Sequence, residues 1–184
     1  MGRLLKKILQ EAKRKLQENG KKEAESDIWP LLHHATGYTQ LDVIKNPLLS
    51  LKQEQERAFF LLFERRLKGE PLGRILGQRS FHGLNFLLNA ATLEPRDDTE
   101  AVLELLIPLL HSWVKETGCV HFVDMGTGSG AIAIAALYHV PQAYAIGLDK
   151  SAAALEMAQK NALNAGVAER FSPCLSDWFK NLTG

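Results

Sequence analysis

The chain has 184 residues, a net charge of +1 and 46% hydrophobic residues, a composition typical of a globular protein with one or two domains. Cys119 and Cys174 form no spacing motif, and the longest wholly apolar run, residues 131–137, is far too short to cross a membrane. These features exclude a disulfide-stabilised scaffold and a helical membrane protein, and they indicate a cytoplasmic location.

The first third of the chain is expected to be helical and without strands. Apolar residues spaced four apart predict a helix that ends near Gly20, and a second helix is expected over residues 22–36. Ser50 followed by Gln53 has the pattern of a capping box that opens a third helix, which Gly69 would close. The sequence therefore predicts a small helical bundle over residues 1–69.

The start of this bundle is strongly basic. Residues 1–22 carry eight Lys or Arg against two acidic residues, Glu11 and Glu18. Two interpretations remain open, a solvated helix face or a docking surface for an acidic or nucleic-acid-bearing partner.

The middle of the chain changes character. An extended stretch is expected from Glu70-Pro71, and residues 81–86 have the pattern of two short strands around a turn. A long helix is expected from Asp97 or Asp98 to Glu116, with Asp97 as its N-terminal cap. We therefore expect a hairpin linker over residues 70–96 and a separate domain over residues 97–184.

After Gly118 the pattern alternates between strands and helices. Strands are expected at residues 121–123, 143–148 and 170–174, and helices at residues 129–139 and 151–165. Strands that alternate with helices form parallel sheets with right-handed crossovers. The predicted fold class is therefore α/β for this part of the chain.

A glycine-rich turn lies between the first of these strands and its helix. It reads Gly126-Thr127-Gly128-Ser129-Gly130, and Asp149 follows nineteen residues later, at the end of the next strand. Glycines allow a tight turn and a close ligand approach, and the helix N-terminus offers unpaired N–H groups. A carboxylate at the position of Asp149 accepts hydrogen bonds from ribose hydroxyls. The sequence therefore predicts a site for a ribose-bearing cofactor.

The turn alone does not decide which cofactor binds. Residues 126–131 satisfy a dinucleotide pattern, but Asp124 stands two residues before the first glycine. A carboxylate there would repel a pyrophosphate and attract the ammonium group of S-adenosylmethionine, which carries no phosphate. S-adenosylmethionine is the favoured cofactor, and a nicotinamide dinucleotide or a turn with no ligand are the alternatives. No P-loop lysine follows the turn.

Other chemistries find no support in the sequence. The six histidines are scattered through separate predicted elements, and no Cys/His cluster has metal-ligand spacing. No serine lies in a nucleophile elbow with a partner His and Asp. We expect no metal site.

Several motifs together resemble those of the HemK/PrmC family, the release-factor glutamine methyltransferases. In chain order they are Glu70-Pro71, Ile75-Leu76-Gly77, Phe81-His82-Gly83, residues 93–100 (Leu-Glu-Pro-Arg-Asp-Asp-Thr-Glu), residues 124–130, Asp149 and Ser176-Asp177-Trp178-Phe179. The resemblance extends over the whole chain, although the helical bundle matches only in kind. Asp97 replaces the family's usual proline, and Arg74 stands where an aromatic residue is common.

The resemblance implies a class-one, Rossmann-like methyltransferase fold, of which residues 97–184 would be the first half. It implies methylation of the glutamine side-chain amide in the Gly-Gly-Gln motif of class-one peptide release factors, with S-adenosylmethionine as donor. Residues 126–130 would line the methionine end of the cofactor, Asp149 would hold the ribose, and Trp178 would lie against the adenine. Trp178 could instead fill the sheet edge. Phe81 and Arg96 would shape the pocket, although Arg96 could instead pair with Glu100.

The family's catalytic motif, Asn-Pro-Pro-Tyr, is not found in this sequence, whose only Asn-Pro is Asn46-Pro47. No catalytic residue is therefore assigned, and we expect a fragment of a longer enzyme that transfers no methyl group by itself. The fold's strand order would leave the outer edge of the first strand unpaired. Two alternatives remain, a nucleic-acid adenine methyltransferase and a non-catalytic fragment that binds release factor. The resemblance makes nucleic acid an unlikely partner, and a membrane is not expected.

Overall fold

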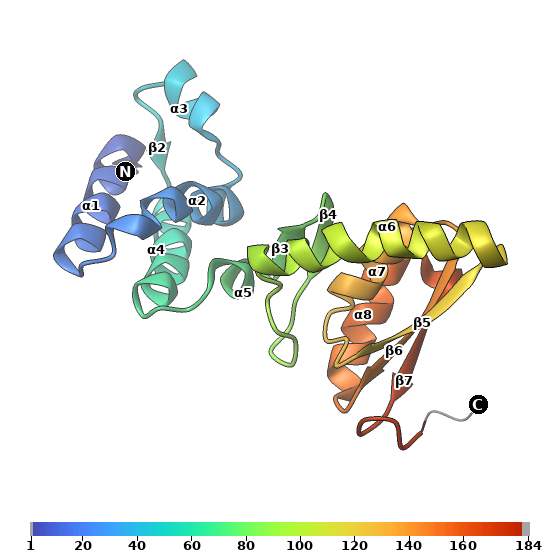
Figure 1. Cartoon of the computed structure of the whole chain (residues 1–184). Coiled ribbons are helices and arrows are strands. Elements are labelled where there is room, and N and C mark those ends of the chain that lie inside the picture. The colour runs from blue at the N-terminus through green and yellow to red at the C-terminus, as the bar shows by residue number, and fades with distance from the viewer. Residues whose placement is uncertain (1, 182–184) are drawn as a thin grey trace. The chain divides into compact units, whose positions relative to one another are not determined.

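The computed structural model describes residues 2–181, which form two compact units divided after Leu76 (Figure 1). Each unit has its own hydrophobic core. The division into a recognition domain, a linker and a methyltransferase domain concerns function and stays a prediction. Among residues 2–181, no helix combines the length and the apolar character that crossing a membrane requires.

The first unit is a helical bundle with one short pair of strands. In chain order it contains β1 (Arg3–Leu4), α1 (Leu5–Glu18), the 3₁₀ helix η1 (Lys22–Asp27), α2 (Ile28–Thr36), α3 (Gln40–Lys45), β2 (Ser50–Leu51), α4 (Gln53–Leu67) and α5 (Leu72–Leu76). The rings of Phe59 and Phe63, one turn apart on α4, stack 5.7 Å from each other in the core. Gly37 adopts a left-handed conformation and ends α2, as its position predicts.

Several local predictions for this unit were wrong. Ser50 pairs with Leu4 in an antiparallel strand instead of capping a helix. The helix that follows is capped differently, since the Gln55 side chain accepts a hydrogen bond from the N–H of Lys52 at 3.1 Å. The helices α3 and α5 were not expected, and α5 begins at Leu72, where an extended stretch was predicted.

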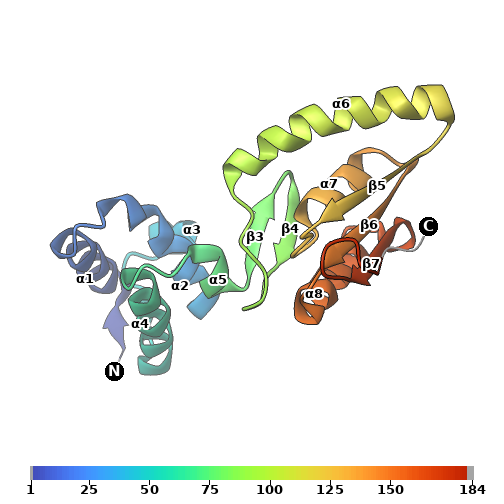
Figure 2. The same ribbon diagram turned by 60° about the horizontal axis from the view of Figure 1, so that its bottom comes forward.

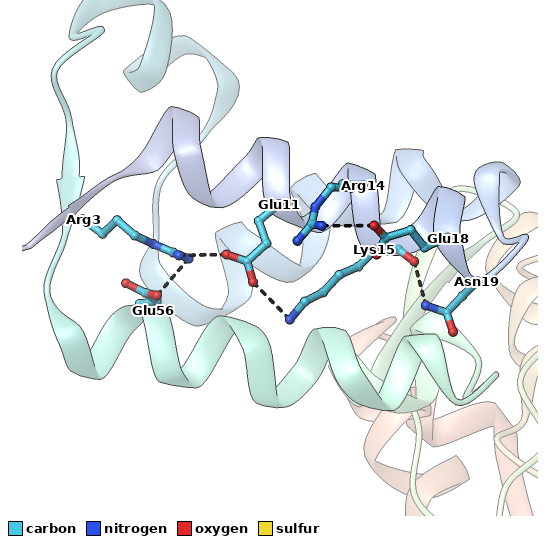
Figure 3. A network of polar contacts seen from close by, with 7 residues as sticks. All are labelled: Arg3, Glu11, Arg14, Lys15, Glu18, Asn19 and Glu56. Atoms are coloured by element: carbon cyan, nitrogen blue, oxygen red, sulfur yellow. Dashed lines mark hydrogen bonds and ion pairs between the residues drawn. The ribbon is translucent and has the colours of Figure 1, made fainter.

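Part of the basic N-terminal segment is paired with carboxylates inside the bundle (Figure 3). The Arg3 guanidinium lies 2.8 Å from the Glu11 carboxylate and 2.9 Å from that of Glu56 on α4. Lys15 reaches Glu11 at 3.1 Å from the other side. These charges connect β1, α1 and α4, so much of the basic pattern has a structural role within the unit.

This network makes the stability of the bundle depend on pH. Partial burial acts to raise the pKa of the Glu11 carboxyl, but hydrogen bonds from Lys15 and Arg3 outweigh it and hold this pKa below its ordinary value. The resulting stability is present above the ordinary pKa and is lost as the pH falls through the lowered one. Glu11→Gln should therefore cost less than about 1 kcal/mol at pH 7 and nothing at pH 2. Amide exchange of Leu31 and Leu32 in the core would measure it, and an equal cost at both pH values would contradict it.

The second unit begins with a β-hairpin that belongs to its core. β3 (Gln78–Phe81) pairs antiparallel with β4 (Leu84–Leu87), as predicted. The two residues between them, His82 and Gly83, have φ angles of +49° and +77°, the combination that tight hairpin turns require. Phe81 and Phe86 are buried in the same hydrophobic cluster as the helices of this unit.

A short 3₁₀ helix, η2 (Asp97–Thr99), leads into the long helix α6 (Glu100–Thr117). The prediction that Asp97 caps this helix was wrong, because its carboxylate instead pairs with Arg79 of β3 at 2.6 Å. The Glu100 carboxylate accepts a hydrogen bond from the backbone N–H of His82 at 2.7 Å. Two acidic groups at the start of α6 thus hold the hairpin.

The remainder is a three-stranded parallel sheet with helical crossovers (Figures 1 and 2). Its elements are β5 (Val120–Met125), α7 (Ala131–His139), β6 (Ala143–Asp149), α8 (Ala152–Asn164), the 3₁₀ helix η3 (Ala168–Arg170) and β7 (Phe171–Leu175). The strand order is β5-β6-β7, so among the described residues β5 lies at one edge of the sheet. This confirms the α/β fold class and leaves the carboxyl ends of β5 and β6 side by side, where both begin a turn.

Candidate functional site

The glycine turn joins the end of β5 to the start of α7. Gly126, Gly128 and Gly130 have φ angles of +70°, +56° and +80°, a region that residues with a side chain rarely adopt. The turn is tied to the neighbouring strand by a hydrogen bond of 2.9 Å from the Thr127 N–H to the carbonyl of Leu148. It closes on itself through the Gly130 N–H, which donates to the Thr127 carbonyl at 2.7 Å.

Asp149 connects this turn to the end of β6. One carboxylate oxygen accepts a hydrogen bond from the Gly128 N–H and the other from the Ser151 N–H, both at 2.9 Å. The Ser151 hydroxyl in turn accepts from the Ala154 N–H at 3.2 Å, which caps α8. Each carboxylate oxygen retains a further lone pair for a ligand. The residue that the sequence assigns to the ribose therefore also fixes the backbone of the turn.

Asp124 lies behind the turn, near the end of β5. Its carboxylate accepts hydrogen bonds from the Thr127 hydroxyl at 2.8 Å and from the backbone N–H of Ala133, in the first turn of α7. A negative charge thus already occupies the N-terminus of α7, the place where a dinucleotide-binding fold would receive a pyrophosphate.

Burial raises the pKa of the Asp124 carboxyl above its ordinary value, and the nearby charge of Asp149 raises it further. Ionising Asp124 in the folded protein therefore costs free energy. Wild-type stability should fall as the pH rises from the ordinary pKa through the raised one, and level off above it.

Asp124→Asn removes this titration while keeping an acceptor for Thr127. Compared with wild type, the variant should gain about 1.4 kcal/mol of relative stability across this window for each unit by which folding raises the pKa. Amide exchange in β6, followed from pH 3 to pH 8, measures the difference. A difference that does not change with pH would contradict the assignment.

A hollow of about 370 Å³ opens at the carboxyl ends of the strands. Its walls are formed by Met125, Gly126, Leu148, Asp149, Lys150, Ser176, Asp177 and Trp178. Three residues predicted for the cofactor, Gly126, Asp149 and Trp178, meet in this hollow. Among the described residues, the carboxylates of Asp149 and Asp177 and the ammonium group of Lys150 line it, and Asp177 is paired with Lys180. Asp149 is therefore the carboxylate of the lining that stays available to a cationic or hydroxyl-bearing ligand.

The far wall of the hollow comes from the segment after β7. The Ser176 N–H donates to the carbonyl of Asp149 at 3.0 Å, which fixes this segment beside β6. Trp178 has a φ angle of +58°, and 71% of its surface is exposed at the rim of the hollow. An exposed aromatic ring beside a carboxylate provides a face on which a planar base can stack.

The structure places the other predicted residues differently. Thr127 and Ser129 are buried and do not line the hollow, while Gly128 and Gly130 shape the turn beneath it. Phe81 lies in the core against Phe86 and not at the hollow. Lys150 lines the wall without having been singled out from the sequence, because only its position after the end of β6 would have marked it. Ser176 also lines the wall; it belongs to a motif quoted from the sequence but was given no role there.

The histidines are not all scattered as the sequence suggested. His82 of the hairpin and His139 of α7 lie together, with 2.9 Å between Nδ1 of the first and Nε2 of the second. Burial lowers the pKa of His139, and the neighbouring His82 lowers it further. Within residues 2–181, no group of three His, Cys, Asp or Glu side chains has the arrangement of a metal site.

Comparison with known proteins gives matches in both units. Residues 7–77 match the model of the PrmC N-terminal domain, and residues 117–183 match that of a methyltransferase domain.

Three relatives illustrate the similarity. A release factor glutamine methyltransferase of Agrobacterium fabrum is 41% identical over 173 residues, covering 94% of this chain and 60% of the relative. One of Bradyrhizobium diazoefficiens is 42% identical over 148 residues, covering 80% of this chain and 50% of the relative. A bifunctional methyltransferase of Rickettsia bellii is 30% identical over 200 residues, covering 97% of this chain and 36% of the relative.

The chain thus spans between one half and three fifths of the length of the two release factor glutamine methyltransferases. The order of the matched domains agrees with the order of the two units, and the glycine turn falls inside the matched methyltransferase domain. On this evidence the chain belongs to the HemK/PrmC family.

Proposed function

We propose that the second unit binds S-adenosylmethionine in the hollow at the ends of β5 and β6. The single observation that carries this proposal is the position of Asp149, which lines the hollow while holding the glycine turn through the Gly128 N–H. In this arrangement the ribose hydroxyls would donate to Asp149, the adenine would stack near Trp178, and the glycine turn, of which Gly126 lines the hollow, would lie beside the methionine part.

The charges of the site favour this ligand over a dinucleotide. Asp124 occupies the N-terminus of α7 and Asp149 lines the hollow, whereas the charge of Asp177 is offset by its ion pair with Lys180. A pyrophosphate at the turn would meet the carboxylates of Asp124 and Asp149, whereas a sulfonium and an ammonium group would be attracted by them. The cofactor, once bound, supplies a methyl group on a positively charged sulfur.

We further propose that the acceptor is the glutamine side-chain amide in the Gly-Gly-Gln motif of a class-one release factor, in the cytoplasm. The names of the relatives support this acceptor. An amide nitrogen is a poor nucleophile, so methyl transfer needs groups that position it and accept its hydrogens. The motif to which the family resemblance assigns this task, Asn-Pro-Pro-Tyr, does not occur in this sequence.

The first unit is proposed to bind the release factor. Its sequence match to the PrmC N-terminal domain supports a role shared with that family, separate from the cofactor site. The 184-residue chain should therefore bind both cofactor and protein substrate but transfer no methyl group by itself.

Two assays test this proposal with the purified chain. In biolayer interferometry, the chain should bind a class-one release factor and not duplex DNA. In a transfer assay with tritiated S-adenosylmethionine, the chain should label neither the release factor nor the DNA. Binding to DNA alone would favour a nucleic-acid methyltransferase. Binding to release factor without any affinity for S-adenosylmethionine would favour a non-catalytic fragment, and methyl transfer would show that catalytic groups lie within these residues.

A further inference from the structure

Asn161 is a buried polar residue of α8 to which neither the sequence motifs nor the hollow assigns a role. Only 2% of its surface is exposed, and its side-chain amide forms three hydrogen bonds. A buried amide that satisfies this much of its hydrogen-bonding capacity holds its neighbours in one arrangement, because breaking any of the bonds leaves a buried group unpaired.

Two of these bonds hold the hairpin. The Asn161 side-chain carbonyl accepts from the N–H of Leu87 at 2.8 Å, and its amide nitrogen donates to the carbonyl of Leu87 at 3.0 Å. Leu87 is the last residue of β4, and it is 74 positions away from Asn161 in sequence. The side chain thus bonds to the end of β4 as a neighbouring strand would.

The third bond holds the glycine turn. The same amide nitrogen donates to the carbonyl of Ser129 at 2.9 Å. The other side of this peptide group, the N–H of Gly130, donates to the Thr127 carbonyl at 2.7 Å. The peptide between Ser129 and Gly130 is therefore fixed at both ends, although the glycine alone would allow it to rotate.

We propose that Asn161 is a positioning residue for cofactor binding, which holds the Ser129–Gly130 peptide in its binding conformation and links it to the hairpin. The inference rests on the proposed cofactor site. Asp149 fixes the turn at the Gly128 N–H and Asn161 fixes it at the Ser129 carbonyl, so the two side chains together determine its path. The same amide also bonds to Leu87, so ligand binding at the turn and the conformation of the hairpin are coupled. The coupling free energy is the same in both directions: a change in the hairpin alters ligand binding by as much as the ligand alters the equilibrium of the hairpin.

Asn161→Asp tests the donor function directly. A carboxylate still accepts from the Leu87 N–H but has no hydrogen for the carbonyls of Leu87 and Ser129. Affinity for S-adenosylhomocysteine should fall about ten-fold at pH 8 relative to wild type. It should recover in part towards pH 5.5, because burial raises the pKa of the new carboxyl and the protonated group again donates.

The matched control is Asn164→Asp, the same chemical change at an exposed position three residues later on α8. This variant should bind S-adenosylhomocysteine as wild type does at both pH values. If the role of Asn161 were purely structural, Asn161→Asp would lower the thermal stability, and its affinity for S-adenosylhomocysteine would not recover at low pH. Calorimetric titrations of the two variants at both pH values separate these outcomes. Asn161→Asp that is folded by circular dichroism and binds with wild-type affinity at pH 8 would overturn the proposal.

A measurement on the unsubstituted chain covers the case in which Asn161→Asp does not fold. S-adenosylhomocysteine should slow amide hydrogen exchange of Leu87, whose N–H bonds to Asn161, more than that of Leu88, whose N–H bonds to the Gly77 carbonyl at 2.8 Å. Equal effects on both amides would overturn the link to the hairpin.

The assignment of the cofactor site can be disproved independently of the proposed role of Asn161. If wild type binds no S-adenosylhomocysteine, the cofactor assignment fails, and Asn161 is then tested by exchange of the Gly130 amide without ligand. That amide should exchange faster in Asn161→Asp than in Asn164→Asp. Equal rates would show that Asn161 does not hold the turn.

Discussion

Replacing Asp149 with alanine is expected to weaken binding of S-adenosylhomocysteine by about 100-fold, the loss that follows when charge-assisted hydrogen bonds worth about 1.5–3 kcal/mol are removed. The substitution removes the proposed ribose acceptor and also releases the N–H groups of Gly128 and Ser151. Asp149→Asn keeps one acceptor oxygen and should lose only about ten-fold. Isothermal titration calorimetry measures both.

The control is Glu156→Gln, which neutralises an exposed carboxylate of α8 that pairs with Lys160. It should leave the affinity unchanged. If Asp149→Ala and Glu156→Gln bind S-adenosylhomocysteine with the same affinity while both remain folded, Asp149 is not part of the cofactor site.

Replacing Gly130 with alanine is expected to destabilise the second unit by about 2–5 kcal/mol, the sum of left-handed strain and overpacking. A Cβ at this position would lie 2.4 Å from Cδ1 of Ile134 and 3.2 Å from Cβ of Ala158, in addition to the φ angle of +80°. The third glycine of the turn thus allows α7 to pack against α8. Urea-dependent amide exchange in β6 reports this unit alone.

Two further glycines separate strain from packing. Gly128 has a φ angle of +56° and Gly166 one of +71°, but a Cβ would meet no atom closer than 3.9 Å at the first and none within 4 Å at the second. Alanine at either position should cost only about 1–2 kcal/mol. A cost for Gly130→Ala no larger than that for Gly166→Ala would show that the α7–α8 contact adjusts freely.

Much of the second unit could be predicted from sequence because its signals are local. The alternation of apolar strands with helices, the three glycines and the carboxylate at the end of β6 each depend on neighbouring residues, and the structure has the parallel sheet expected from the alternation. The hairpin was predicted for the same reason, since His82-Gly83 provides the turn between Phe81 and Leu84.

Two of the wrong local predictions share one physical cause. Ser50 and Asp97 are both residue types that favour helix N-caps, but each interacts with a residue far along the chain. Ser50 pairs with Leu4 between two strands, and Asp97 forms an ion pair with Arg79. A capping side chain contributes about 1 kcal/mol, which a strand pairing or an ion pair can match. Only the folded arrangement decides between them.

The parts of the site that sequence reasoning missed depend on contacts over long sequence separations. Asn161 reaches Leu87 and Ser129, which are 74 and 32 positions away, and His82 meets His139 across 57 positions. Ser129 and His82 belong to local motifs, but no local pattern predicts the contacts that Asn161 and His139 make with them. Their roles became visible only when the hairpin, the turn and the helices were placed in one core.

The central claim is that the glycine turn, with Asp124 and Asp149 beside it, binds a sulfonium-bearing nucleoside and not a diphosphate. Competition calorimetry on the 184-residue chain, with S-adenosylhomocysteine and NADH as the two ligands, tests it most directly. We predict measurable binding of S-adenosylhomocysteine that NADH does not displace. Tight binding of NADH, with no heat from S-adenosylhomocysteine, would contradict the account.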